Sequence, residues 1–196
     1  MNEFNKAALL NSAKRINVSY FKEQQEDAIN AIWQWWQSSS ITFTLSGYAG
    51  TGKTFIMRHL VRYLITEKVC VTAPTHKALR VLENSSGRKG MTIQSLCGLR
   101  PDVDIEDYNI ENPSFKVIGE QKMRSYKLVI VDECSMVNPG LFTLLVKTAM
   151  QCRCKLLFLG DELQIPYVVT KNKDEEDNYN RISPSFTHTD VQFRLT

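Results

Sequence analysis

The stretch Gly47-Tyr48-Ala49-Gly50-Thr51-Gly52-Lys53-Thr54 is a complete G-x-x-x-x-G-K-T sequence, and it decides the fold. An apolar, β-prone run over residues 41–45 leads into it, and a helical pattern follows it, carried by Phe55, Leu60, Val61 and Leu64. In such a loop the glycines let successive backbone N–H groups point at a β-phosphate, aided by the positive end of the following helix. Glycine-rich turns between a strand and a helix also occur without ligands. Lysine and threonine in register after a strand nevertheless favour a nucleoside triphosphate site.

Two side chains of this loop have a direct chemical use. Lys53 can reach the β- and γ-phosphates of a bound nucleotide, which makes it a candidate catalytic residue as well. The hydroxyl of Thr54 can ligate Mg²⁺, so ATP and Mg²⁺ are the expected cofactors. The expected nucleotide-binding residues of the loop are Gly47, Ala49, Gly50, Thr51, Gly52, Lys53 and Thr54.

Short apolar runs alternate with helical patterns along most of the chain. Four runs predict strands, at residues 41–45, 69–73, 128–131 and 155–159. Continuous apolar strands that alternate with helices are typical of a parallel sheet covered on both faces, so the sequence predicts an α/β fold of the P-loop NTPase type. In such sheets ligands bind at the carboxyl ends of the strands, and the motifs of this chain follow those ends.

Two further helices are predicted around this sheet. The first covers residues 22–37, where an apolar stripe is formed by Ala28, Ile29, Ile32, Trp33 and Trp36. Its tryptophans could serve as base-stacking platforms, but their place before a buried strand favours packing in the core. The second begins at Asn138-Pro139, because asparagine is a good N-cap and proline suits the first helical position.

Two stretches interrupt the alternation of strands and helices. Residues 99–126 contain an acidic half and a basic half, and they are too long for a simple loop. We expect a small inserted lobe there, with a β-hairpin as its candidate form, between two parts of one domain at residues 1–98 and 127–196. Residues 169–186 are polar, with an acidic run at 174–177, and are expected to form a solvated loop.

Composition sets limits on the partners of the chain. Its 196 residues suit one domain with an insertion, and a net charge of +3 is too weak to indicate nucleic-acid binding by itself. Five cysteines in or near apolar segments favour buried, reduced thiols, and Cys152 and Cys154 are too closely spaced for a zinc pair. The sequence shows neither a signal peptide nor an apolar run of about 18 residues. We therefore expect a cytoplasmic monomer without membrane association.

Two adjacent carboxylates follow the predicted strand at residues 128–131. Asp132 is placed to hold Mg²⁺, directly or through water, and Glu133 to deprotonate the water that attacks the γ-phosphate. An acidic pair after a strand can also be a helix N-terminal charge, but the phosphate loop elsewhere in the chain favours the catalytic interpretation. Gln164 follows the last predicted strand and can hold the attacking water or donate to the γ-phosphate. A polar loop glutamine taken alone indicates nothing.

Five motifs in a fixed order carry a resemblance to a known family. After GYAGTGKT come APTHKA (residues 73–78), TIQSL (92–96), VDECSM (131–136) and GDELQIP (160–166). This ordered set resembles superfamily 1 DNA helicases of the RecD/Dda branch over roughly residues 19–196, and SPSFTH (183–188) extends the likeness. The resemblance implies a RecA-like lobe of an ATP-dependent 5′-to-3′ DNA helicase, in which ATP hydrolysis drives translocation on single-stranded DNA and duplex unwinding. Such enzymes act in DNA replication, recombination and repair.

The resemblance also implies roles for single residues. Gln25 matches the glutamine that contacts the adenine edge in these enzymes. The segments that bind the DNA single strand match Pro74, Thr75, His76, Lys77, Thr92 and Gln94. Hydroxyl, imidazole and backbone N–H groups suit phosphates, and proline offers an apolar face to a sugar or base. Without the resemblance, residues 73–76 would be interpreted as a strand-to-helix turn with a threonine cap.

The same resemblance implies what surrounds this lobe. Residues 99–126 occupy the place of a lobe that carries a strand-splitting pin, and a second RecA-like lobe with charge-stabilising arginines is absent from this chain. One hypothesis is therefore the ATPase lobe of a DNA helicase from a bacterial or phage-infected cell. The other is a non-catalytic nucleotide- or strand-binding module that docks on a replication or recombination partner. The intact Lys53, Asp132, Glu133 and Gln164 favour the first, and a kinase-like transferase lacks a recognisable acceptor site.

Overall fold

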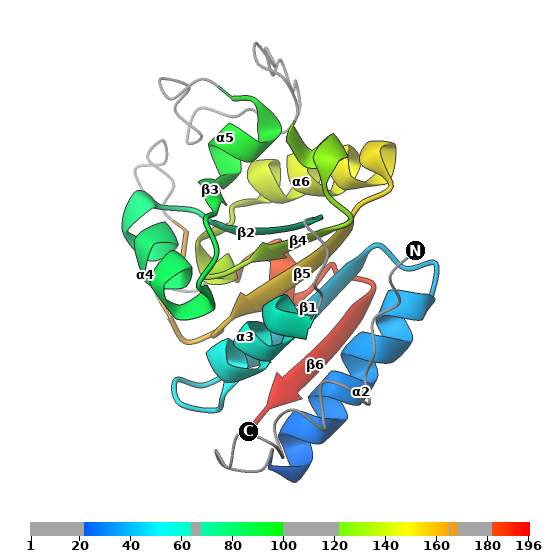
Figure 1. Cartoon of the computed structure of the whole chain (residues 1–196), viewed down its shortest axis with the longest axis vertical. Helices are drawn as coiled ribbons and strands as arrows, with labels where there is room; N and C mark the ends of the chain where they lie inside the picture. Colours follow the sequence, from blue (N-terminus) through cyan, green and yellow to red (C-terminus); the bar gives the residue numbers. More distant parts are fainter. Residues whose placement is uncertain (1–21, 64–67, 100–121, 165, 168–181) are drawn as a thin grey trace.

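The computed structural model describes residues 22–63, 68–99, 122–164, 166–167 and 182–196. Within these residues, a six-stranded sheet has the order β3-β2-β4-β5-β1-β6, and every pair of neighbouring strands is parallel (Figure 1). The strands are β1 (Thr42–Gly47), β2 (Val69–Ala73), β3 (Met91–Thr92), β4 (Leu128–Val131), β5 (Lys155–Gly160) and β6 (Val191–Leu195). The predicted α/β fold of a RecA-like P-loop NTPase is confirmed.

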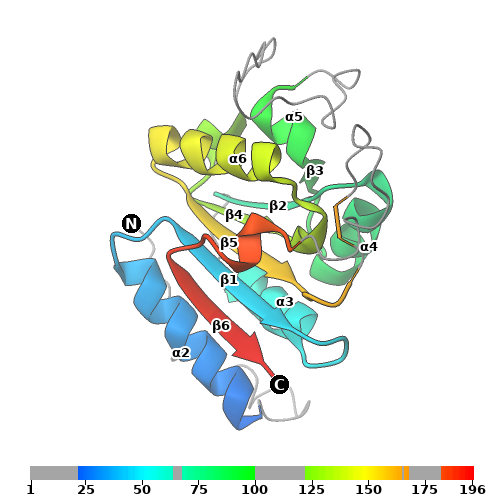
Figure 2. The same cartoon turned by 180° about the vertical axis from the view of Figure 1, so that it is seen from behind.

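Helices cover both faces of the sheet, as the continuous apolar strands predicted. One face packs against α2 (Glu23–Gln37), α3 (Lys53–Tyr63) and α4 (His76–Ser86). The other packs against α5 (Ile93–Cys97), α6 (Pro139–Cys152) and three short 3₁₀ helices, η2 (Lys122–Ser125), η3 (Cys134–Met136) and η5 (Pro184–Phe186). Figure 1 shows α3 in front of the sheet, and Figure 2 shows α6 in front of its opposite face. The strands β2, β4 and β5 therefore contribute alternate side chains to two separate cores.

The predicted strands at residues 69–73 and 128–131 are confirmed at those bounds, and the other two are shifted or longer at an end by one or two residues. The strands β3 and β6 were not predicted. β3 is two residues long, and β6 alternates partly buried and exposed side chains instead of forming an apolar run. At the start of β6, the Asp190 carboxylate accepts hydrogen bonds from the backbone N–H groups of Ile41 and Thr42, both at 2.8 Å. This contact aligns β6 beside β1.

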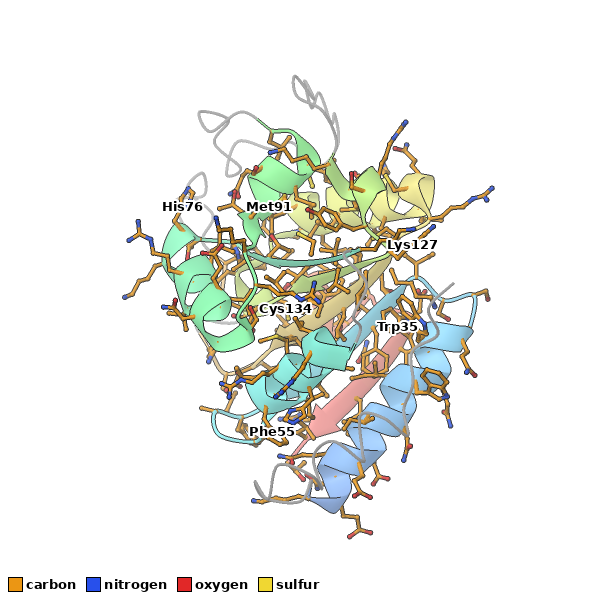
Figure 3. The ribbon with its side chains drawn as sticks, in the orientation of Figure 1. Trp35, Phe55, His76, Met91, Lys127 and Cys134 are labelled. Carbon is orange, nitrogen blue, oxygen red and sulfur yellow. The ribbon has the colours of Figure 1, made fainter. Side chains whose placement is uncertain are left out.

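The helix predicted over residues 22–37 is present as α2, but its predicted apolar stripe is wrong at one end. Trp35 is 2% exposed, whereas Trp33 and Trp36 are only partly buried against the core. Inside the core Trp35 packs against Phe43, with ring centres 5.5 Å apart, and it is also contacted by Lys155. The ammonium group of Lys155 lies 4.8 Å from the centre of the indole ring and donates to the Trp35 carbonyl at 2.6 Å (Figure 3 labels Trp35). A cation placed at the carbonyl end of a helix in this way also stabilises its dipole.

The helix predicted from Asn138-Pro139 is confirmed as α6, and the Asn138 side chain accepts the backbone N–H of Leu141 at 2.8 Å. The four cysteines Cys70, Cys97, Cys134 and Cys154 are buried thiols, and Cys152 is partly buried. Burial raises the pKa of the Cys70 and Cys97 thiols to about 12, so both are neutral packing groups. In the described part of the chain, no helix has the length and apolar character that a membrane crossing requires.

The two irregular stretches are described only in part. Most of the predicted inserted lobe, residues 100–121, lies outside the described residues, as do residues 168–181 of the predicted solvated loop. The end of that loop is not solvated, because Ser183, Ser185 and Phe186 are buried. The Ser183 and Ser185 hydroxyls donate to the carbonyls of Val137 at 2.6 Å and Cys134 at 3.0 Å. Serine is common in solvated loops, but the hydroxyls of Ser183 and Ser185 satisfy buried backbone carbonyls.

Candidate nucleotide-binding site

The phosphate loop connects β1, which ends at Gly47, to α3, which begins at Lys53. Gly50 and Gly52 have φ angles of 84° and 103°, in the region that favours glycine. A Cβ on Gly52 would lie 2.2 Å from the side-chain nitrogen of Gln25. The glycine at this position therefore permits both the backbone curl and the close approach of Gln25.

Lys53 and Gln25 are both anchored to this loop. The Lys53 ammonium group donates to the carbonyls of Gly47 and Tyr48, at 2.9 Å for Tyr48. The Gln25 amide donates to the Thr51 carbonyl at 3.1 Å, and its oxygen accepts from the backbone N–H of Lys22 at 3.2 Å. The structure thus brings Gln25 from α2 against the phosphate loop, as its predicted role requires. Contact with an adenine edge stays a prediction.

Three charged groups converge at the carboxyl ends of β1, β4 and β5. Burial lowers the pKa of Lys53, and the negative charges of Asp161 and Asp132 oppose this shift. Burial raises the pKa of Asp132, opposed by the hydrogen bond from the Glu133 N–H at 3.0 Å and by the Lys53 charge. A lysine flanked by two aspartates suits a site that binds and releases anionic phosphates together with a divalent cation.

Asp161 was not among the predicted site residues, although it follows β5 as Asp132 follows β4. It is 6% exposed, and its carboxylate accepts the backbone N–H of Leu163 at 3.0 Å. Its carbonyl accepts the backbone N–H of Gln164 at 3.1 Å. Asp161 therefore shapes the turn that carries Gln164, whose own side chain is exposed. The signal that could have identified it is an acidic residue directly after a buried strand.

Glu133 has a left-handed backbone, with φ of 52° and ψ of 44°. Few residues other than glycine adopt this conformation, and it is often found at functional sites. Burial and the neighbouring Asp132 raise the pKa of Glu133, and the positive charge of Lys77 opposes the rise. The next residue, Cys134, packs closely against Gly160, where a Cβ would lie 2.6 Å from the Cys134 sulfur. A carboxylate with a raised pKa is a better proton acceptor than an ordinary one.

The predicted strand-binding residues lie along the same edge of the sheet. Pro74 to Lys77 follow β2, Thr92 ends β3 and Gln94 lies just after it in α5, and Ala73 and Thr92 are paired across the two strands. Figure 3 shows His76, at the start of α4, and Met91, in β3, on the same side of the molecule. The structure thus brings the two segments together, while contact with DNA stays a prediction.

Both threonines of these segments are helix N-caps. The Thr75 hydroxyl accepts the backbone N–H of Ala78 at 3.2 Å at the start of α4. The Thr92 hydroxyl accepts the backbone N–H of Ser95 at 3.3 Å at the start of α5. The alternative interpretation of Thr75 as a cap therefore describes a real contact, and any role in strand binding must be additional to it.

The residues present fit a magnesium ion bound together with a nucleotide. Among the described residues, no group of three histidine, cysteine, aspartate or glutamate side chains could hold a metal ion alone. Thr54 and Asp132 offer a hydroxyl and a carboxylate, the hard oxygen donors that Mg²⁺ prefers. Mg²⁺ is usually bound by one or two protein ligands plus phosphate oxygens and water, so two such donors beside a phosphate loop suffice.

Fold and site together define a P-loop nucleoside triphosphatase with a RecA-like sheet. A family described as "AAA domain" matches residues 25–170, and the chain belongs to this family. The ATP-dependent DNA helicase dda of Enterobacteria phage T4 is 32% identical over 178 residues, which is 89% of this chain and 38% of that protein. The ATP-dependent DNA helicase Pif1 of Campylobacter jejuni is 26% identical over 159 residues, 76% of this chain and 34% of that protein. The predicted resemblance to superfamily 1 helicases is confirmed.

Solved structures agree on the fold. Pif1 helicase from Bacteroides, in complex with ADP-AlF3 and ssDNA, is 23% identical with a TM-score of 0.61, over 91% of this chain and 42% of that one. Pif1 helicase from Candida albicans has the same identity and TM-score, over 91% of this chain and 40% of that one. The chain spans about two fifths of the length of such relatives.

Proposed function

We propose that this chain is the ATP-binding and ATP-hydrolysing lobe of an ATP-dependent DNA helicase that moves 5′-to-3′ on single-stranded DNA and unwinds duplexes. The observation that carries the proposal is the convergence of Lys53, Asp132 and Glu133 at one edge of the sheet, because a simple binding module has no use for Glu133. The T4 and Campylobacter relatives are described as ATP-dependent DNA helicases, which supports the same function.

The site residues divide the reaction among them. Lys53 and the backbone of the phosphate loop bind the phosphates, and Gln25 reads the base. Asp132 and Thr54 hold Mg²⁺, which neutralises phosphate charge when bound. Glu133 accepts a proton from the attacking water, and Gln164 orients that water or contacts the γ-phosphate.

The strand-binding half supplies the DNA contacts. We propose that backbone and side-chain donors of Pro74 to Lys77, and of Thr92 and Gln94, contact the phosphates and sugars of a single strand. The related Bacteroides Pif1 holds single-stranded DNA together with ADP-AlF3, which supports a common motor scheme. The four buried free thiols support a reducing compartment, consistent with the cytoplasm of a bacterial or phage-infected cell.

Rapid turnover needs groups beyond this lobe. In related phosphoryl-transfer enzymes, an arginine supplied by another domain raises the rate by about 10³–10⁵. Because this chain spans about two fifths of its relatives, we expect the 196 residues alone to hydrolyse ATP slowly, with little stimulation by single-stranded DNA.

The test separates binding from hydrolysis in the 196-residue chain. A fluorescent ATP analogue is titrated with Mg²⁺, and hydrolysis of radiolabelled ATP is followed with protein in excess. Glu133→Gln should keep the affinity within about twofold and lower hydrolysis at least ~100-fold, because the amide cannot accept a proton. Glu26→Gln, an exposed glutamate on α2, is the matched control and should change neither. Tight binding with equal hydrolysis in all three proteins would favour the non-catalytic module, and no binding would reject both.

A further inference from the structure

Arg194, in β6, joins two loops of the candidate site. Its guanidinium group donates to the Tyr48 hydroxyl at 3.1 Å and lies 5.3 Å from the centre of the Tyr48 ring. Another of its nitrogens is 3.6 Å from the carboxylate of Glu162. Tyr48 is the second residue of the phosphate loop, and Glu162 lies between Asp161 and Gln164. One side chain therefore contacts both the loop that binds phosphates and the loop that carries Gln164.

The pattern of β6 places Arg194 where it can make these contacts. Val191, Phe193 and Leu195 pack into the core beneath α2 and α3, so the residues between them project from the opposite face. β6 runs parallel to β1 with Ser46 paired to Arg194, and β1 lies between β6 and β5. The carboxyl ends of the three strands thus bring Arg194, Tyr48 and Glu162 together from separate parts of the chain.

Within the described residues, both loops carry exposed side chains. Tyr48 is 43% exposed, and Leu163, beside Glu162, is 76% exposed. The carbonyl of Tyr48 also accepts a hydrogen bond from Lys53, so movement of Tyr48 moves a partner of the phosphate-binding lysine. Arg194 is a planar cation that can bond and stack on tyrosine while pairing with a carboxylate, which lysine cannot do equally well.

We propose that Arg194 is a positioning residue that fastens the phosphate loop to the Gln164 loop, through Tyr48 on one side and Glu162 on the other. The inference rests on the proposed ATP-binding function of the site. In the proposed function the phosphate loop binds the β-phosphate of both ADP and ATP, whereas Gln164 acts only at the γ-phosphate or at the water that attacks it. We call the contacts of Arg194 with Tyr48 and Glu162 the clamp. Loss of the clamp should therefore weaken binding of ATP more than binding of ADP.

The size of the effect follows from exposure. The ion pair of Arg194 and Glu162 has side chains that are 47% and 32% exposed. Exposed ion pairs and cation–π contacts each have modest energies, so we expect about a threefold to tenfold loss of ATP affinity and at most about twofold for ADP. Salt should weaken the wild-type clamp and reduce the difference between wild type and variant.

The first experiment needs no nucleotide. Hydrogen exchange of backbone amides is compared in the wild type and in Arg194→Gln, with Arg58→Gln as the matched control, since Arg58 bonds the Ser85 carbonyl between α3 and α4. Arg194→Gln should speed exchange in residues 47–52 and 161–164 together and leave β4 and α6 unchanged. Faster exchange throughout the protein, or in neither loop, would overturn the clamp.

The second experiment measures affinity for fluorescent analogues of ATP and ADP. Arg194→Gln should lower the ATP-to-ADP affinity ratio at least about threefold, and Arg194→Lys should restore only part of it because it retains the charge without the planar stack. Equal losses for both nucleotides would mean that Arg194 does not act through the Gln164 loop. If wild type binds neither nucleotide, the proposed function fails, while the exchange result still decides whether the clamp exists.

Discussion

The nucleotide half of the sheet edge and the strand-binding half are built in different ways. At the carboxyl ends of β1, β4 and β5, partly or fully buried charges lie close enough to interact: Lys53 with Asp132 and Asp161. Behind β2 and β3, the polar residues Thr75 and Thr92 cap helices, as they would in a protein without DNA. Buried charges of this kind are costly without a function, whereas helix caps stabilise any fold. The function of the nucleotide half can therefore be inferred from its charged groups, whereas the strand-binding half is identified mainly by family resemblance.

The largest expected effect is a loss of ATP affinity, which should be confined to the nucleotide half. Lys53→Ala removes the cation that faces the phosphates, and we expect at least ~100-fold weaker binding of ATP, about 2.7 kcal/mol. Affinity for a labelled single-stranded oligonucleotide, measured by anisotropy without nucleotide, should stay within about twofold. Equal ATP affinity in the variant would remove the basis of the phosphate-loop assignment, and a parallel loss of DNA binding would show that the two halves are not separable.

Two glycines with left-handed backbones give the next effect, because one lies in the phosphate loop, the other ends α4 away from the site, and their surroundings differ. A Cβ at Gly52 meets the Gln25 amide at 2.2 Å, whereas a Cβ at Gly87 meets nothing within 4 Å. Gly52→Ala should lower ATP affinity at least about tenfold, through strain and displacement of Gln25. Gly87→Ala should cost about 1 kcal/mol of unfolding free energy and leave ATP affinity unchanged. Similar nucleotide affinity in both variants would mean that the loop tolerates the clash by moving Gln25.

The sequence predicted the nucleotide half of the molecule better than the rest. The phosphate loop and four apolar strands are local patterns, and they fixed the fold class, the nucleotide-binding loop and the carboxylate pair. The strand β6 was missed because its alternating, partly polar residues lack an apolar run. The contact between Arg194 and Tyr48 joins positions 146 apart, which no spacing rule encodes.

Other predictions about which side chains are buried were wrong for specific reasons. Helical periodicity placed Trp33 and Trp36 in the core, but Trp35 lies there instead, packed against Phe43 and contacted by Lys155. Buried Ser183 and Ser185 looked like loop residues, since their carbonyl partners lie far away in the sequence. The predicted roles of Gln25 and of the strand-binding residues came from resemblance, because no local spacing rule encodes a contact with a base or a DNA strand.

A third substitution asks whether Thr75 does more than cap α4. Thr75→Ala removes the cap and should cost about 1 kcal/mol of unfolding free energy, whereas Thr75→Asn keeps a good cap and should retain wild-type thermal stability. If the threonine contacts a DNA strand, both variants should lose about threefold to fivefold in affinity for a labelled single-stranded oligonucleotide at fixed salt. Wild-type DNA affinity in Thr75→Asn would instead assign Thr75 to the cap alone.

The smallest expected effect tests an electrostatic link between the two halves. Lys77 follows β2, Glu133 follows the neighbouring β4, and the charge of Lys77 lowers the pKa of Glu133 against the rise caused by burial and Asp132. Glu133 must be deprotonated to accept a proton, so hydrolysis should fall as pH decreases through its raised pKa. Lys77→Gln removes the cation, favours the protonated form of Glu133 and should move this acid limb to higher pH, with the same rate at the alkaline plateau.

Single-turnover hydrolysis without DNA across a pH series measures the acid limb, and Arg80→Gln, on the exposed side of α4, is the control that should leave it in place. An unchanged limb in Lys77→Gln would show that the strand-binding half does not influence the catalytic carboxylate, and a lower plateau would show that Lys77 acts on the reaction by another route.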